Sequence, residues 1–167
     1  MSEQDGQAGQ EGQDEQAQFS LQRIYIKDVS FESPRSPDAF VGQWKPTVNL
    51  DLNSHHKVVG TDLYEVVLNV TVTVKKEDGD VVYLSEVQQA GIFMIRGMNE
   101  EGFAQTLGSF CPSVLFPYAR EAIDALVIKG SFPPLMLAPV NFDAIFAQSR
   151  QQQLDTNSAS ATPPVVN

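Results

Sequence analysis

The chain has 167 residues, a length that suits one domain with tails. Apolar residues make up 42% of it, enough to build a core, and the formal net charge is -10. That acidity argues against binding to bare nucleic acid or to an anionic membrane surface. It fits a basic partner, although acidity that merely keeps the protein soluble is an equally good explanation.

The two ends of the chain are predicted to be disordered. Residues 1–18 contain five acids and no base, which matches neither a secretory signal nor a transit peptide. Residues 151–167 are rich in Gln, Ser, Ala and Pro. No apolar run is long enough to span a bilayer. We therefore expect one domain over residues 19–150, no direct membrane insertion and a cytoplasmic location.

The first half of the domain is predicted to form strands. Alternation from Phe19 to Glu32 predicts the first strand. Its expected faces are Leu21, Tyr25, Val29 and Phe31 on one side, and Ile24, Ile26, Asp28, Ser30 and Glu32 on the other. Prolines within residues 33–38 end this strand. A loop with Phe40 and Trp44 leads to a second strand over Thr47–Asn53.

The third and fourth strands form a predicted hairpin. Asp62–Lys75 carries valines at alternate positions, a pattern typical of strands. Asp78 and Gly79 supply a hairpin turn, and Val81–Ile95 returns as the fourth strand. We expect four antiparallel strands with one polar face.

The second half of the domain is predicted to form helices. Asn99 is a candidate N-cap for a short helix that ends near Ser109. Pro112 can open the next helix, which Pro117 would kink and Gly130 would end. Asn141 caps a last amphipathic helix. The fold class is therefore α+β, with a four-stranded antiparallel sheet followed by helices on one face.

Catalytic and metal-binding motifs are absent from the sequence. His55 and His56 are adjacent on a predicted loop, where their side chains would point apart. Cys111 is the only cysteine, and no histidine near it in the sequence would activate it. We expect a protein that is not an enzyme and that needs no cofactor or metal.

Two groups of residues are candidates for binding. Asp28 and Glu32 share a strand face, as do Leu84 and Glu86, and an ordinary solvated sheet surface would explain both pairs. A second group places aromatic, Leu and Met side chains beside prolines and turns, where they are hard to bury together. Such side chains suit a surface that accepts many apolar segments. This group comprises Phe40, Trp44, Phe132, Leu135, Met136, Leu137, Phe142, Ile145 and Phe146.

Several sequence blocks resemble the SecB family of protein-export chaperones. They cover about Phe19–Gln153 in the family's order. The blocks are Gln22–Glu32, Tyr64–Leu68, Glu86–Phe93, Cys111–Glu121 and Leu137–Ala144. The chain departs from the family only at its ends, where the family is variable.

The resemblance implies functions for these residues. It implies that Asp28, Glu32, Leu84 and Glu86 dock the motor ATPase SecA, whose zinc-bearing tail is basic. It implies that unfolded secretory preproteins bind a groove formed by Phe40, Trp44, Phe132, Leu135, Met136, Leu137, Phe142 and Phe146. It also implies a homotetramer, a dimer of dimers, whose assembly depends on Tyr83, Ser85, Val87, Gln89, Ala104 and Leu107. The fourth strand could pair edge to edge with a neighbouring subunit.

The implied function is that of an ATP-independent chaperone, which holds new precursors unfolded and delivers them to SecA. Two alternatives remain open at this point. A close relative could serve a toxin–antitoxin system, and a non-catalytic acidic scaffold would share the charge and the self-association.

Overall fold

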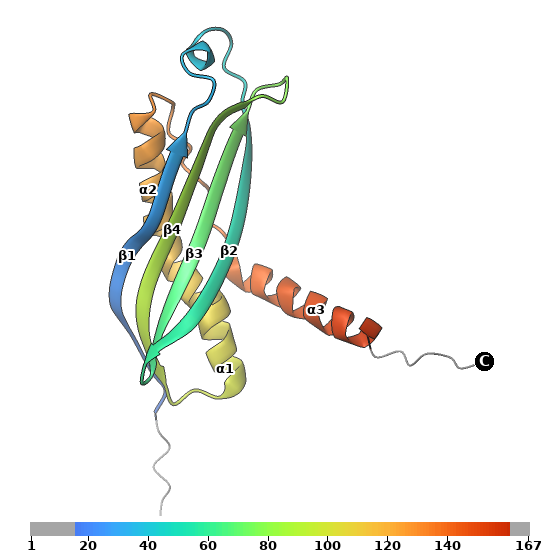
Figure 1. The fold of residues 1–167 in the computed structure, drawn as a ribbon. Coiled ribbons are helices and arrows are strands. Elements are labelled where there is room, and N and C mark those ends of the chain that lie inside the picture. Colours follow the sequence, from blue (N-terminus) through green and yellow to red (C-terminus); the bar gives the residue numbers. More distant parts are fainter. Residues whose placement is uncertain (1–15, 161–167) are drawn as a thin grey trace, which may run out of the picture.

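The computed structural model describes the backbone of residues 16–160 and the side chains of residues 16–156. Its strands form one antiparallel sheet in the order β1-β4-β3-β2, so the last strand lies in the interior beside the first (Figure 1). The strands are β1 (Gln18–Glu32), β2 (Thr47–Gly60), β3 (Leu63–Lys75) and β4 (Val81–Arg96). The predicted α+β class and four-stranded antiparallel sheet are confirmed.

A continuous helical stretch follows the sheet. It consists of α1 (Glu100–Gln105), a π-helical segment (Thr106–Phe110) and α2 (Cys111–Lys129). The predicted division into two helices at Pro112 is wrong. Pro112 lies in the first turn of α2, and the π-helical segment before it carries the helix through this position from α1.

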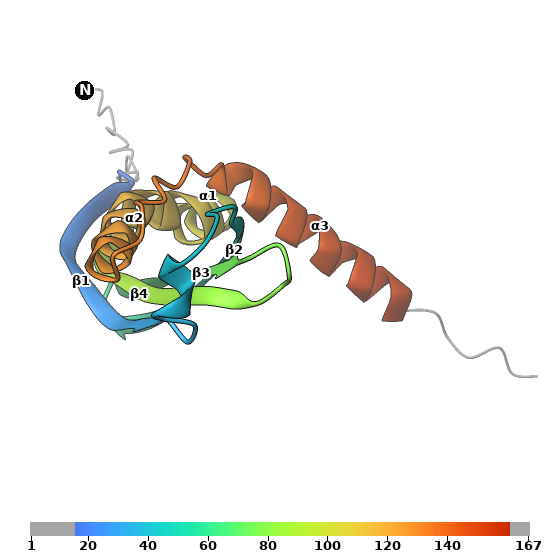
Figure 2. The same cartoon turned by 90° about the horizontal axis from the view of Figure 1, so that it is seen from above.

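The helices cover one face of the sheet, and we call the opposite face the outer face. α2 packs on β4 and β3, whereas α3 (Phe142–Ser160) projects away from the body (Figures 1 and 2). The sequence predicts disorder from residue 151 onward, but α3 continues to Ser160. The predicted disorder of residues 1–15 and 161–167 falls outside the described residues. Within residues 16–160, no helix is both long and apolar enough to cross a bilayer.

The core lies between β3, β4 and α2. Alternate residues of β3 are fully buried on the helix side, as the valine pattern predicts: Val66, Leu68, Val70, Val72 and Val74. Residues of α2 spaced by four meet them: Leu115, Ala119, Ile123 and Val127. This spacing places one stripe of the helix against the sheet.

β1 departs from the strict alternation predicted for it. Its pairing with β4 shifts register between Leu21 and Arg23, and again between Ile26 and Asp28. Tyr25 therefore lies opposite Ala90 on the outer face, while Ile26 lies on the helix face. The prediction that Tyr25 shares a face with Leu21 is wrong, because each bulge adds one residue and changes the face of those that follow. Ile24 moves to the helix face for the same reason.

Short turns join β2 to β3 and β3 to β4, whereas residues 33–46 form a longer loop between β1 and β2. Gly79 has φ +88 in the turn before β4, a conformation that glycine adopts freely, and its N–H donates to the carbonyl of Lys76 at 2.9 Å. β2 is longer than predicted and runs to Gly60. His55 and His56 therefore lie on a strand, opposite Val67 and Val66, and not in a loop.

Candidate binding surfaces

Five aromatic rings gather where the end of β1, the loop after it and the end of α2 meet. The ring of Phe132 lies at the centre, with centroids 4.8 Å from Tyr83, 5.1 Å from Phe40, 5.7 Å from Trp44 and 6.4 Å from Phe31. Phe132 is only 5% exposed, whereas Phe40 is 51% and Trp44 39% exposed. Phe132 therefore supports two outward rings from below, which fixes them before anything binds.

The loop after α2 is held in place by two side chains of α2. The Asp124 carboxylate accepts hydrogen bonds from the backbone N–H groups of Leu135 at 3.0 Å and Met136 at 3.3 Å. Arg120 donates to the carbonyl of Leu137 at 3.3 Å. Met136 has φ 48 and is 76% exposed, so these contacts hold it in a backbone conformation uncommon for a residue other than glycine.

The structure divides the eight residues predicted to line a groove. Three are exposed: Phe40, Trp44 and Met136. Two are half-buried: Leu135 and Phe146. Three are buried: Phe132, Leu137 and Phe142. Other side chains cover these last three residues in the single subunit, so they do not present a free surface there. Their part in a peptide groove stays a prediction.

Two of the predicted groove residues attach α3 and do not join the five aromatic rings around Phe132, which we call the Phe132 cluster. The ring of Phe142 lies 5.8 Å from that of Phe116 on α2. Phe146 packs so closely on Gly108 that a Cβ there would lie 2.4 Å from its ring. Val41, which is 76% exposed beside Phe40, is an apolar residue that the sequence reasoning missed. Its position next to Phe40, in the loop between β1 and β2, was the sequence feature that could have identified it.

The four predicted motor-docking residues lie together on the outer face. Glu32 is the register partner of Leu84, and Glu86 is the partner of Ser30 on β1. Asp28 is opposite Gln88, two residues along the same face. Neighbouring positions in one antiparallel pair are within reach of a single ligand. The structure thus brings these residues onto one surface, which we call the acidic surface.

Asp51 extends the acidic surface toward β2. Thr71 is the partner of both Glu86 and Asp51, so Ser30, Glu86, Thr71 and Asp51 form one row across all four strands. The Thr71 hydroxyl donates to Glu86 at 3.3 Å. The sequence analysis did not join Asp51 to the site, because the order of the strands in the sheet was not known.

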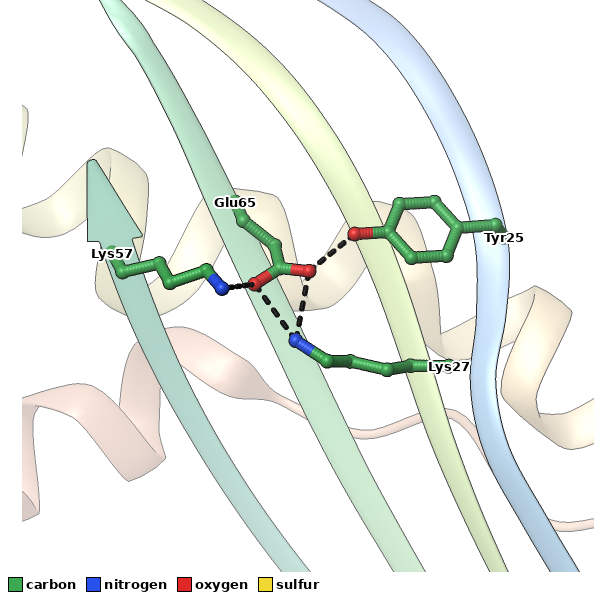
Figure 3. A network of polar contacts seen from close by, with 4 residues as sticks. All are labelled: Tyr25, Lys27, Lys57 and Glu65. Carbon is green, nitrogen blue, oxygen red and sulfur yellow. Dashed lines mark hydrogen bonds and ion pairs between the residues drawn. The ribbon is translucent and has the colours of Figure 1, made fainter. Parts of the chain in front are cut away.

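One buried carboxylate on the outer face has three donors, as Figure 3 shows. Lys27 on β1 contacts both Glu65 oxygens at 2.9 Å, Lys57 on β2 contacts one at 3.1 Å, and the Tyr25 hydroxyl donates to the other. Burial would raise the pKa of Glu65, but these hydrogen bonds outweigh it and lower the pKa to about 2. Burial and the Glu65 carboxylate raise the pKa of Tyr25 to about 12. We call these four residues the Glu65 network.

Most of the predicted assembly residues are buried inside the subunit. On β4 these are Tyr83, Ser85, Val87 and Gln89, all at most 1% exposed, and Leu107 is 2% exposed. Ala104 is half-buried. Edge-to-edge pairing of β4 with a neighbour is ruled out, because β1 and β3 occupy both of its edges. These buried residues could affect assembly only through the elements packed on them.

Cys111 is buried at the start of α2, and burial raises the pKa of its thiol to about 12. Because the thiolate is the reactive form, a thiol with so high a pKa is a poor nucleophile at neutral pH. The structure therefore favours a structural cysteine over a catalytic one.

Comparison with known proteins places the chain in a family. Residues 12–153 match the family model described as preprotein translocase subunit SecB. A protein-export protein SecB of Stutzerimonas stutzeri is 55% identical, with 97% of this chain and 99% of the relative covered. The Azotobacter vinelandii protein of the same name is 56% identical, with 93% and 94% covered.

A solved structure agrees with the fold. It is a SecB-like chaperone of Mycobacterium tuberculosis in complex with a ChAD peptide from an antitoxin. It has a TM-score of 0.61 at 18% identity and covers 73% of this chain and 90% of the other. The family match and the identity to these relatives show that this chain belongs to the SecB family of protein-export chaperones.

Proposed function

We propose that this protein holds newly made secretory precursors unfolded in the cytoplasm, without ATP, and delivers them to the motor SecA. The observation that carries the proposal is a fixed apolar display: Phe40 and Trp44 stand on buried Phe132, and Met136 is held out by its loop. Membership of the SecB family supports the role in export. We further propose that the holding step involves no catalysis and no cofactor.

The apolar display suits unfolded chains better than one folded partner. Aromatic and Met side chains offer large, adaptable contacts that do not depend on a particular sequence. Burying one large apolar side chain contributes on the order of 2 kcal/mol, so holding a chain requires contacts at several points along it. Several subunits, each with such a display, would supply those points.

Arrest of refolding is the test of the holding function. A slow-folding secretory precursor is diluted from denaturant into buffer with the purified protein and no nucleotide, and recovery of native fluorescence is followed. We expect wild type to arrest refolding and Trp44→Ser to arrest it less. The matched control is Val58→Ser, which removes an apolar side chain that is 69% exposed on β2, at the other end of the sheet from the rings around Phe132. No arrest of any client would overturn the proposal.

We propose that the acidic surface docks SecA electrostatically. The expected outcome is that Asp28→Lys with Glu86→Lys abolishes binding of SecA in calorimetry while refolding arrest is retained. Glu77→Lys with Asp155→Lys makes the same change of charge at exposed positions in the β3–β4 turn and on α3, so it separates local from overall charge effects. Wild-type binding should weaken with added salt. Unchanged affinity in the first double variant would refute this docking site.

We propose that the working form is a homotetramer, a dimer of dimers. A single subunit leaves large apolar side chains of the helical stretch exposed, with Phe110 at 51% and Ile128 at 56%. An assembly that sandwiches the helices between sheets would bury them. Light scattering in the refolding buffer should give the mass of four subunits. A monomeric mass would contradict this assembly.

The toxin–antitoxin alternative is not favoured, because the relatives of 55% and 56% identity are export proteins by name. The neighbour that binds an antitoxin peptide supports only the fold. A dedicated acidic scaffold would bind one folded partner and leave the refolding of unrelated clients unaffected. The refolding assay therefore separates this alternative from the chaperone.

A further inference from the structure

The register of β1 decides whether its acids belong to the acidic surface. The second bulge leaves Lys27 without a partner in the ladder, and Asp28 is then opposite Gln88 on the outer face. Without that extra residue, the pairing of Ile26 with Gln89 would continue to Asp28 with Val87, on the helix face. Glu32 would turn away with it, because a one-residue slip moves every following side chain to the other face. The bulge is thus required to place both acids beside Glu86.

The Glu65 network holds the residues on which this bulge depends. Tyr25 and Lys27 stand on either side of Ile26, and both reach from β1 across β4 to the same carboxylate on β3 (Figure 3). Ala90, the register partner of Tyr25, is fully buried although it lies on the outer face. A short side chain there leaves room for the phenol to cross the strand.

The same point of β1 is also held from the helix side. The side-chain amide of Gln89, on the helix face of β4, donates to the backbone carbonyl of Tyr25 at 2.9 Å. Gln89 is 1% exposed, so this bond is made away from water, where the loss of a partner is costly. β1 is therefore fixed from both faces beside the bulge, in addition to its ladder with β4.

We propose that Tyr25 and Lys27, bound to Glu65, are positioning residues that hold the β1 bulge and so present Asp28 and Glu32 on the acidic surface. The proposal rests on the docking function proposed above for that surface. Neither residue needs to touch the partner. Their charge and hydrogen bonds are directed to Glu65, and their effect on docking passes through the backbone of β1.

Lys27 and Lys57 allow a test in which two explanations predict opposite signs. Both lysine ammonium groups contact the same Glu65 oxygen, Lys27 Nζ at 2.9 Å and Lys57 Nζ at 3.1 Å, but only Lys27 is on the bulge. If charge alone matters, Lys27→Met and Lys57→Met both make the surface more negative and tighten binding of a basic partner. If Lys27 positions the bulge, Lys27→Met weakens binding and Lys57→Met does not.

The experiment measures calorimetric affinity for purified SecA on full-length variants, with refolding arrest and mass as controls. We expect Lys27→Met to weaken docking by about tenfold, the equivalent of one lost charge-assisted contact, and Lys27→Arg to restore it. Tyr25→Phe changes no charge and should also weaken docking. Lys57→Met should bind as wild type or more tightly. Equal tightening by both lysine variants, or wild-type docking by Tyr25→Phe, would overturn the proposal.

A register measurement separates this proposal from the docking function. In nuclear Overhauser spectra, the backbone of Asp28 should contact that of Gln88 in wild type and Lys57→Met, and lose this contact in Tyr25→Phe and Lys27→Met. If wild type fails to bind SecA, the docking function is refuted and the register decides the positioning role alone. Retention of the Asp28–Gln88 contact in both β1 variants would refute that role even where docking is confirmed.

Discussion

The Glu65 network predicts how the free energy of unfolding depends on pH. The three donors lower the pKa of Glu65 from 4.5 to about 2, so the folded state binds its proton less readily than the unfolded state. A shift of this size stabilises the fold by about 3 kcal/mol at neutral pH. Because the folded pKa is lowered, the stabilisation is complete above the unfolded value of 4.5. It is lost as the pH falls toward 2, with roughly 1 kcal/mol left at pH 3.

Glu65→Gln is the variant that tests this dependence. We expect it to be less stable than wild type by up to about 3 kcal/mol at pH 7, and the difference to shrink steadily between pH 4.5 and 2. The assay is denaturant unfolding at equal subunit concentration, because assembly makes apparent stability depend on concentration. Glu86→Gln, an exposed acid of the same face, should differ by less than about 0.5 kcal/mol at any pH. A difference for Glu65→Gln that stays constant from pH 7 to 3 would refute the reasoning.

Two substitutions and one labelling experiment test the apolar parts of the structure. Phe132→Ala should cost about 3–5 kcal/mol in denaturant unfolding and weaken refolding arrest, because Phe40 and Trp44 lose the ring beneath them; arrest at the wild-type level would exclude this support. Gly108→Ala would place a Cβ 2.4 Å from the Phe146 ring, so α3 should detach and its amides exchange faster; unchanged exchange would contradict that packing. Cys111, with its pKa raised to about 12, should react with a thiol reagent at pH 8 only after unfolding, and rapid labelling of the native protein would refute its burial.

Local signals in the sequence predicted the elements that depend on local chemistry. Asn99 caps α1, its side-chain oxygen accepting from the N–H of Gly102 at 2.8 Å. Asn141 does the same for α3, accepting from Ala144 at 3.0 Å. Both helix starts were predictable because an N-cap acts within three residues of itself. The valine alternation of β3 was equally readable, since one face of that strand is wholly buried.

Features that depend on distant partners were not predictable from the sequence. The faces of β1 were misassigned because its pairing with β4 shifts register twice, and a bulge is defined by the pairing with a strand far away along the chain. Phe132 looked like a surface residue because it lies beside prolines. It is buried only because rings from β1, β4 and the loop after β1 close over it.

Neighbouring residues of β4 affect different properties of the protein: some affect docking of a partner, and others affect packing and assembly. Its outward residues, Leu84 and Glu86, belong to the acidic surface, whereas Ser85 and Val87 between and beside them are buried on the helix side. A change at Glu86 therefore alters what the surface offers to a partner and leaves the packing intact. A larger or charged side chain at Ser85 must disturb the packing on the helix side of the sheet, where α2, the element whose outer side is proposed to meet other subunits, packs on β4. Assembly and docking can thus depend on one strand and still be separable, because successive side chains point to opposite faces of the sheet.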